Sequence, residues 1–196
     1  LRSLGLPQEP MVGDSVAAGV DVVTFSGDKV LGGPQAGLLV GRRASIERIR
    51  KNPMMRALRC GKLTYAALEA TLRLYLDREK LLEEHPVLRM LTVSRDELEQ
   101  RGRDLVQRCS ALGERGWRIE VTESAAQAGS GSMPLEEIPS IAVTVAPAGL
   151  SAGELAARLR HGQPPVLGYV RDDRLHLDLR TLSVDDVDVV GSALRL

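Results

Sequence analysis

Cysteine is scarce in this sequence, and long apolar runs are absent. Two cysteines among 196 residues, Cys60 and Cys109, cannot supply the disulfide framework on which small secreted domains depend. No stretch reaches the roughly 18 consecutive apolar residues that a membrane-spanning helix needs. The segment Leu1 to Gly5 does not have the pattern of a signal peptide. We therefore expect a globular, cytoplasmic protein, which a hydrophobic content of 43% also indicates.

The usual groupings of metal ligands and catalytic triads are also missing. The histidines His85, His161 and His176 are scattered without a partner at metal-site spacing, so we expect them to be structural and predict no metal. No Ser-His-Asp triad can be assembled. The charges cancel, with 26 basic and 26 acidic residues. The segment 42–62 nevertheless has Glu47 as its one acid and should attract phosphate-like anions through Arg42, Arg43, Arg48, Arg50, Lys51, Arg56, Arg59 and Lys62.

One lysine, Lys29, stands between two segments that are predicted to be strands. Residues 20–25 are rich in β-branched and aromatic side chains, as a buried strand requires, and Ser26-Gly27 ends this strand. Gly32-Gly33-Pro34 predicts a sharp turn, after which residues 36–40 return beside the first strand. Lys29 is therefore expected where the strands of an open α/β sheet end, the usual location of ligand crevices.

A lysine in this position is a candidate for covalent chemistry. An amine that is partly desolvated and close to cations loses its proton more readily and can form a Schiff base, for which pyridoxal phosphate is the obvious carbonyl. Ser26 could bind the cofactor phosphate with its hydroxyl. The alternative is a solvated lysine in a turn, because turns collect Gly, Asp and Lys. The Ser-x-x-Lys pair of penicillin-recognising hydrolases requires a helix, which Gly32-Gly33-Pro34 would break.

Four longer segments of the sequence favour the cofactor-binding lysine over the solvated turn lysine. They are TFSGDKVLGGPQAGLLVGRR, NPMMRALRCGKLTYAALEATLRLYL, GSGSMPLEEIPS and PPVLGYVRDDRLHLDLRTL. In order and spacing, from about Glu9 to the C-terminus, they resemble the bacterial selenocysteine synthases, the L-seryl-tRNA(Sec) selenium transferases. The resemblance implies a pyridoxal-phosphate enzyme of the aspartate aminotransferase fold type (fold type I), in which Lys29 of SGDK carries the cofactor. It also implies that Arg56 and Arg59, which we expect on one helical face, bind the anionic selenium donor.

The resemblance also implies a reaction and partners. Its substrates would be seryl-tRNA(Sec) and selenophosphate. Lys29 would hold the cofactor, yield it to the seryl group and then remove the α-proton as a general base. After the serine hydroxyl is lost, selenium would add from selenophosphate held by Arg56 and Arg59. We further expect a homo-oligomer with sites at subunit boundaries, and neither a membrane nor DNA as a partner.

The length limits what the chain can do by itself. A chain of 196 residues suffices for one domain or two small ones, whereas the resembled enzymes are more than twice as long. We therefore interpret the chain as a C-terminal fragment of class α/β, without turnover on its own. Residues 1–62 are predicted to be the remnant of the cofactor-binding large domain, residues 63–86 a linking helix and residues 87–196 a small α/β sandwich domain.

Two other interpretations remain. Another fold-type-I enzyme, such as a cysteine desulfurase or selenocysteine lyase, would need a histidine before the lysine and a mobile catalytic cysteine. The sequence instead has Asp28 before Lys29, and the position of Cys60 is unsuitable. A non-catalytic module that packs against copies of itself is the other alternative.

Local signals predict helices in the first half of the chain. A short helix over residues 10–18 is opened by a proline. A second helix is predicted to begin after Ser45 as its N-cap and to end before Pro53. The longest helix is predicted from Thr64 to Pro86, with helical spacing of Leu68, Leu72, Tyr75, Glu79 and Leu82.

In the second half of the chain, the sequence pattern predicts alternating helices and strands. Capping boxes begin helices at Ser94 and Ser151, and Ser183 caps the last helix. The glycine-rich loop from Gly129 to Pro139 either reaches toward a ligand or is a mobile connector. The predicted strands are 117–122, 141–145, 166–170 and 175–179, the last two joined as a hairpin.

Overall fold

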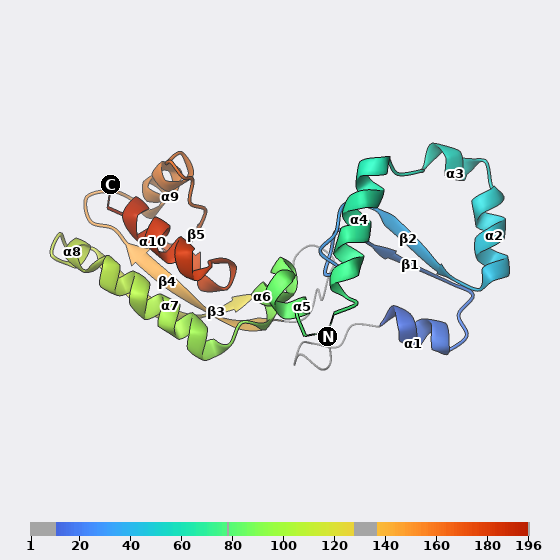
Figure 1. The fold of residues 1–196 in the computed structure, drawn as a ribbon. Helices are drawn as coiled ribbons and strands as arrows, with labels where there is room; N and C mark the ends of the chain where they lie inside the picture. The colour runs from blue at the N-terminus through green and yellow to red at the C-terminus, as the bar shows by residue number, and fades with distance from the viewer. Residues whose placement is uncertain (1–10, 78, 128–136, 196) are drawn as a thin grey trace. The chain divides into compact units, whose positions relative to one another are not determined.

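The computed structural model of the chain describes residues 11–77, 79–127 and 137–195 (Figure 1). Contacts divide it into two compact units. Unit 1 contains the chain up to Thr92, and unit 2 contains Val93–Gln127 and the chain from Glu137 onward. The division follows Thr92, a few residues beyond the segment 63–86 that the sequence predicts as a linker.

Unit 1 is built around a strand pair. Strand β1 (Val22–Ser26) pairs antiparallel with β2 (Gly37–Gly41), with Thr24 opposite Leu39. Helix α1 (Val12–Ala17) precedes β1. The predicted return of the chain beside its first strand is confirmed, and the connection between the two strands carries Lys29.

Five helices follow β2 among the described residues of unit 1. Their bounds are α2 (Arg43–Lys51), α3 (Met54–Ala57), α4 (Lys62–Leu74), α5 (Leu81–Glu84) and α6 (Pro86–Thr92). The prediction of Ser45 as an N-cap is wrong, because Arg42 is the N-cap residue of α2 and makes no side-chain cap hydrogen bond. Arg42 is instead fixed by Asp21: its N–H donates to the Asp21 carbonyl at 2.9 Å, and its guanidinium lies 3.2 Å from the Asp21 carboxylate.

The predicted single helix from Thr64 to Pro86 is also wrong. Helix α4 ends at Leu74, and α5 is a separate single turn. Oδ1 of Asp77 accepts the N–H groups of Glu79 and Lys80 at 3.1 Å and 3.3 Å. A short polar side chain that binds nearby backbone N–H groups offers the chain an alternative to helical bonding, and here it accompanies the break. At 13 residues, α4 is also shorter than the 14-residue α7 (Arg95–Arg108) of unit 2.

Unit 2 contains a four-stranded antiparallel sheet in the order β3-β4-β6-β5. The strands are β3 (Arg118–Ala126), β4 (Ile138–Ala146), β5 (Tyr169–Arg171) and β6 (Arg174–Asp178). With α7, the helices of this unit are α8 (Ser110–Gly113), α9 (Ala152–Arg160), the 3-10 turn η2 (Leu179–Thr181) and α10 (Val184–Ala193).

The core of unit 2 lies between one face of this sheet and its helices. Alternating strand residues such as Val143 and Leu177, which pair with each other across β4 and β6, belong to a single buried cluster. Leu105 of α7, Leu155 of α9 and Val190 of α10 belong to the same cluster. The three helices therefore pack against the same face of the sheet.

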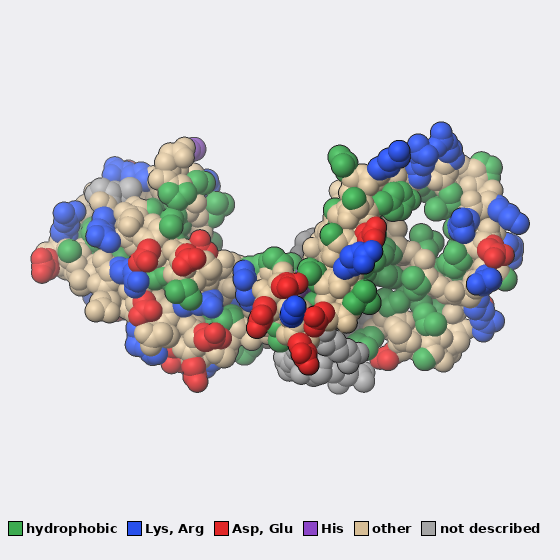
Figure 2. Space-filling view, viewed as in Figure 1, with side chains coloured by type: hydrophobic (Ala, Val, Ile, Leu, Met, Phe, Trp, Pro, Cys, Tyr) green, Lys and Arg blue, Asp and Glu red, His purple; other side chains and the backbone are tan. Residues whose placement is uncertain are grey.

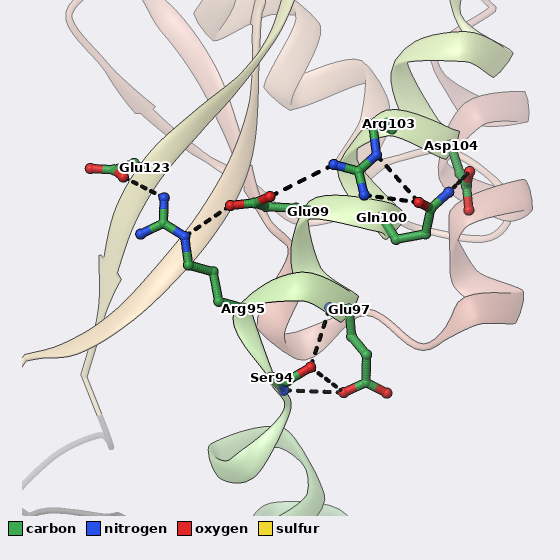
Figure 3. Close-up of polar contacts among 8 residues, drawn as sticks. All are labelled: Ser94, Arg95, Glu97, Glu99, Gln100, Arg103, Asp104 and Glu123. Atoms are coloured by element: carbon green, nitrogen blue, oxygen red, sulfur yellow. Dashed lines mark hydrogen bonds and ion pairs between the residues drawn. The ribbon is translucent and has the colours of Figure 1, made fainter.

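Serine caps fix where the helices of unit 2 begin. The predicted capping boxes at Ser94 and Ser151 are confirmed, and Ser183 forms a third with Asp186. Figure 3 shows the Ser94–Glu97 box together with the polar face of α7. On that face the Arg95 guanidinium lies 2.8 Å from Glu99 and 2.5 Å from Glu123 of β3. These groups are exposed, so solvent leaves such ion pairs with little net effect on stability.

The hairpin predicted around residues 171–174 is confirmed. Strands β5 and β6 pair antiparallel, with Arg171 opposite Arg174. Asp172 and Asp173 between them have φ angles of 50° and 56°, as a type I′ turn requires at both central positions. Of the predicted loop 129–139, residues 129–136 lie outside the described residues. Within the stretches that the structure describes, no helix combines the length and apolar character needed to cross a membrane.

Candidate functional site

The Lys29 loop, residues 27–36 between β1 and β2, is closed at its base by glycine backbone. Gly27 N–H donates to the carbonyl of Ala36, and the Gly27 carbonyl accepts from the N–H of Gly33, both at 2.8 Å. Gly27 is buried, and a Cβ on it would lie 2.7 Å from the Pro34 carbonyl oxygen. Only a glycine allows so close an approach, so the two ends of the loop are held together.

Lys29 begins a tight turn within this loop. Its carbonyl accepts the N–H of Gly32 at 2.8 Å. Gly32 has a φ of +72°, in the left-handed region that favours glycine. Next to it, Leu68 and Thr71 of α4 lie within van der Waals reach of the position that a Cβ on Gly33 would take. The turn is therefore held both by its own backbone and by a helix.

The amine of Lys29 is accessible. The side chain is 43% exposed, and Nζ lies 3.3 Å from Oδ2 of Asp28. The sequence predicts a partly desolvated amine beside cations, whereas the charged neighbour in this ion pair is an anion. Ser26, the last residue of β1, is also exposed. An accessible primary amine can condense with an aldehyde, and a nearby hydroxyl can donate to an anion.

The structure separates Arg56 and Arg59 in a way that the sequence does not predict. Arg56 lies in α3, which ends at Ala57, and Arg59 follows the helix. Placing both on one helical face is therefore wrong. The helix is a single turn with Pro53 as its N-cap residue, and Oδ1 of Asn52 accepts the N–H of Met54 at 2.9 Å. Both arginines are exposed, and Figure 2 shows Lys and Arg side chains gathered over α2 and α3.

Sequence comparison assigns a family to the chain that carries these groups. A sequence model described as L-seryl-tRNA selenium transferase matches residues 1–183, which include Ser26, Lys29 and both arginines. The chain belongs to this family. The family predicted from the SGDK and RALR segments is thereby confirmed.

Individual relatives agree with this assignment. The L-seryl-tRNA(Sec) selenium transferase of Nitratidesulfovibrio vulgaris is 53% identical over 194 residues, which are 97% of this chain and 41% of that protein. The protein of the same description from Alkaliphilus metalliredigens is 46% identical over 195 residues, 100% of this chain and 42% of the relative. The chain thus spans about two fifths of the length of the relatives that it matches.

A solved structure shares the fold. The chain matches D-glucosaminate-6-phosphate ammonia-lyase with a TM-score of 0.56 at 23% identity, over 92% of this chain and 44% of that chain. Identity at this level supports a common backbone arrangement and says nothing of a common substrate. The mixed α/β class predicted from the sequence is in agreement with it.

Other candidate residues do not form a site in the described structure. Among residues 11–77, 79–127 and 137–195, no group of His, Cys, Asp and Glu could hold a metal ion. Cys109 is buried, and burial raises the pKa of its thiol. The free thiol of Cys60 is partly buried.

Two side chains against the Lys29 loop were missed by sequence reasoning. The sequence predicts Tyr75 to be a packing residue on the apolar face of a helix, and His85 to be a structural histidine. In the structure both contact the backbone of Leu31, two residues after Lys29. They lie 44 and 54 residues away from Leu31 in the chain, so no local spacing pattern brings them to this loop.

Proposed function

We propose that this chain carries the covalent lysine of a pyridoxal-phosphate-dependent L-seryl-tRNA(Sec) selenium transferase. The observation that carries the proposal is the family match over residues 1–183, which includes the exposed amine of Lys29 on its closed loop. The fold would be that of the aspartate aminotransferase type, with unit 1 as part of the large domain and unit 2 as the small domain. The chain's relatives are more than twice its length, so we expect no turnover from the 196 residues alone.

The residues of the loop fit the two ends of this cofactor in their chemistry. Lys29 Nζ would bind the aldehyde carbon, and the Ser26 hydroxyl would donate to the phosphate. Pyridoxal phosphate, when bound, supplies an electron sink for the carbanion that forms next to the amino group. The carboxylate of Asp28 accepts a hydrogen bond from Nζ at 3.3 Å and so can orient the amine before the cofactor binds.

The same residues would act on the two substrates. With the cofactor and seryl-tRNA(Sec) bound, Nζ of Lys29 would remove the α-proton of the seryl group as a general base. The guanidinium groups of Arg56 and Arg59 would bind the oxygens of selenophosphate, since guanidinium forks match phosphate geometry. The surrounding basic segment 42–62 would attract both anionic substrates.

Association with further copies of the chain and a cytoplasmic location complete the proposal. Helix α4 exposes a shallow groove lined by Tyr65, Leu68, Glu69, Leu72, Arg73 and Leu76. Leu63 of α4 is 87% exposed, and Leu76, two residues after the helix ends, is 82% exposed. Apolar exposure of this kind favours burial against another protein surface. Sedimentation velocity of the chain tests for a homo-oligomer, and a monomer at all concentrations would contradict it.

Covalent trapping tests the central claim. The chain is incubated with pyridoxal phosphate, reduced with borohydride and mapped by mass spectrometry. Lys29 should carry the pyridoxyl group in clear excess over Lys51, Lys62 and Lys80, the other lysines of the chain. Lys29→Arg keeps the charge, removes the nucleophile and should abolish the preferred adduct. Equal labelling of all lysines would overturn the proposal.

A further inference from the structure

The carbonyl oxygen of Leu31 receives two side-chain hydrogen bonds. The hydroxyl of Tyr75 lies 3.1 Å from it, and Nε2 of His85 lies 2.9 Å from it. Leu31 is the third residue of the turn that begins at Lys29 and closes with the N–H of Gly32. Two distant side chains therefore fix the peptide plane inside the turn that carries the amine.

The tautomer of His85 follows from its other contact. The N–H of Leu88 donates to Nδ1 at 3.2 Å, so Nδ1 is the acceptor of the ring. We assign the proton of the neutral imidazole to Nε2, which can then donate to the Leu31 carbonyl. His85 is 1% exposed, and both of its ring nitrogens have partners. A buried ring that is bonded at both nitrogens has a fixed orientation.

Tyr75 completes the arrangement. Its hydroxyl lies 3.2 Å from Nε2 of His85 and 3.5 Å from the carbonyl of Val30, and the two rings meet edge to face with centroids 5.3 Å apart. Burial raises the pKa of the Tyr75 hydroxyl, so it remains a donor at neutral pH. Tyr75 closes the C-terminus of α4, and His85 closes that of α5, so both donors come from helix ends.

Packing restricts the turn from the same side. A Cβ on Gly32 would lie 2.4 Å from Cε1 of His85 and 3.3 Å from Cγ2 of Val87. The turn thus lies directly against the imidazole, with no room for a side chain between them. Hydrogen bonds and steric contact together leave the backbone after Lys29 little freedom to move.

We propose that Tyr75 and His85 are positioning residues for Lys29: through the Leu31 carbonyl they hold the turn in the conformation from which the amine is presented for covalent linkage. The inference rests on the proposed function, because it assigns these residues to the same lysine. Neither residue touches the reacting atoms. Because they hold the backbone around Lys29 in place beforehand, binding of an aldehyde does not have to supply the entropy cost of ordering it.

Competition between lysines within one chain measures this effect. With Tyr75→Phe, the pyridoxyl adduct at Lys29, divided by the summed adduct at Lys51, Lys62 and Lys80, should fall about fivefold, as expected for one lost hydrogen bond. Tyr65→Phe is the matched control, because this tyrosine is 59% exposed on the same helix. It should leave the ratio unchanged.

His85 is tested by a pair of variants. His85→Leu removes the donor and should lower the ratio at least as much as Tyr75→Phe does. His85→Gln keeps an N–H donor at this position. The adduct ratio should therefore recover part of the loss seen with His85→Leu. A ratio that follows the melting temperature of the variants, with no rescue by Gln, would assign His85 to stability alone and overturn the inference.

Amide hydrogen exchange gives a readout that needs no cofactor. The N–H of Gly32 is bonded to the Lys29 carbonyl, so its exchange rate reports opening of the turn. Tyr75→Phe and His85→Leu should accelerate it about fivefold, whereas the N–H of Gly27 at the loop base should be less affected. Unchanged exchange at Gly32 in both variants would overturn the inference. Equal labelling of all lysines in the unsubstituted chain would instead contradict the proposed function and, with it, the role assigned here.

Discussion

Gly32 lies against the imidazole of His85 so closely that a Cβ on it would come within 2.4 Å of Cε1 and 2.7 Å of Nε2. Its φ of +72° independently disfavours any residue with a side chain. The SGDKVLGG segment therefore keeps a glycine here for two separate physical reasons. Both the contact with His85 and the positive φ occur three residues after Lys29, within the turn that this lysine begins.

Gly32→Ala should destabilise unit 1 by about 2 kcal/mol or more, from the left-handed backbone and from displacement of His85. Gly37→Ala is the matched control, because a Cβ on Gly37 meets no atom within 4 Å. It should be neutral or slightly stabilising, since glycine weakens a strand. Urea unfolding followed by far-ultraviolet circular dichroism compares them. Equal stability of the two variants would show that the space at Gly32 relaxes without cost.

Leu155 should be among the residues on which unit 2 depends most. It is 0% exposed in the cluster between the helices and the sheet. Leu155→Ala should cost about 2–5 kcal/mol, because a cavity remains where the side chain was. Leu167→Ala removes the same atoms from a residue that is 76% exposed and should change stability by less than about 0.5 kcal/mol. Denaturant midpoints of both variants test the difference, and similar losses would contradict the assignment of this core.

The capping boxes should make unit 2 sensitive to acid. The backbone and hydroxyl of Ser94 donate to Glu97 and hold its pKa below the ordinary 4.5, and Ser183 lowers the pKa of Asp186 below 3.8 in the same way. A carboxylate with a lowered pKa in the folded state stabilises the fold above its ordinary pKa. That stabilisation is lost as the pH falls through the lowered value.

The melting temperature of unit 2 should therefore decline between about pH 5 and pH 2. The combined variant Glu97→Gln and Asp186→Asn keeps polar groups at both positions but cannot titrate there, so its decline should be shallower. Glu114→Gln removes an exposed carboxylate outside the boxes and serves as the control. Parallel pH profiles of all three proteins would exclude the boxes as the cause.

Sequence patterns predicted the elements that local chemistry determines. The capping boxes at Ser94 and Ser151 depend on residues three apart, and the turn at Asp172 depends on adjacent residues. The β-branched and aromatic residues 20–25 placed Lys29 after the first strand, where the structure also has it. These features need no knowledge of distant contacts.

Features fixed from a distance could not be predicted in this way. The start of α2 is fixed by Arg42 binding Asp21, a residue that precedes β1. The apolar spacing continues through Leu82 although the helix ends at Leu74, near which the Tyr75 hydroxyl bonds to Leu31. This tertiary contact and the local hydrogen bonds of Asp77 together override a helical periodicity that continues in the sequence. Tertiary contacts also supply the part of the candidate site that the motifs do not reveal.

The turn between β5 and β6 offers a substitution that should stabilise the protein. Asp172 and Asp173 both have positive φ angles, 50° and 56°, which Asn-Gly adopts at lower cost than Asp-Asp. The double change Asp172→Asn and Asp173→Gly should raise the stability of unit 2 by about 0.5–1 kcal/mol. Asp173→Ala should lower it by a similar amount, because alanine lacks the short polar side chain that tolerates a positive φ. Urea unfolding midpoints of the unsubstituted chain and of both variants give their order of stability. Stabilisation by alanine would mean that the turn does not keep its type I′ geometry in solution, and the register that pairs Tyr169 with His176 would then need to be determined again.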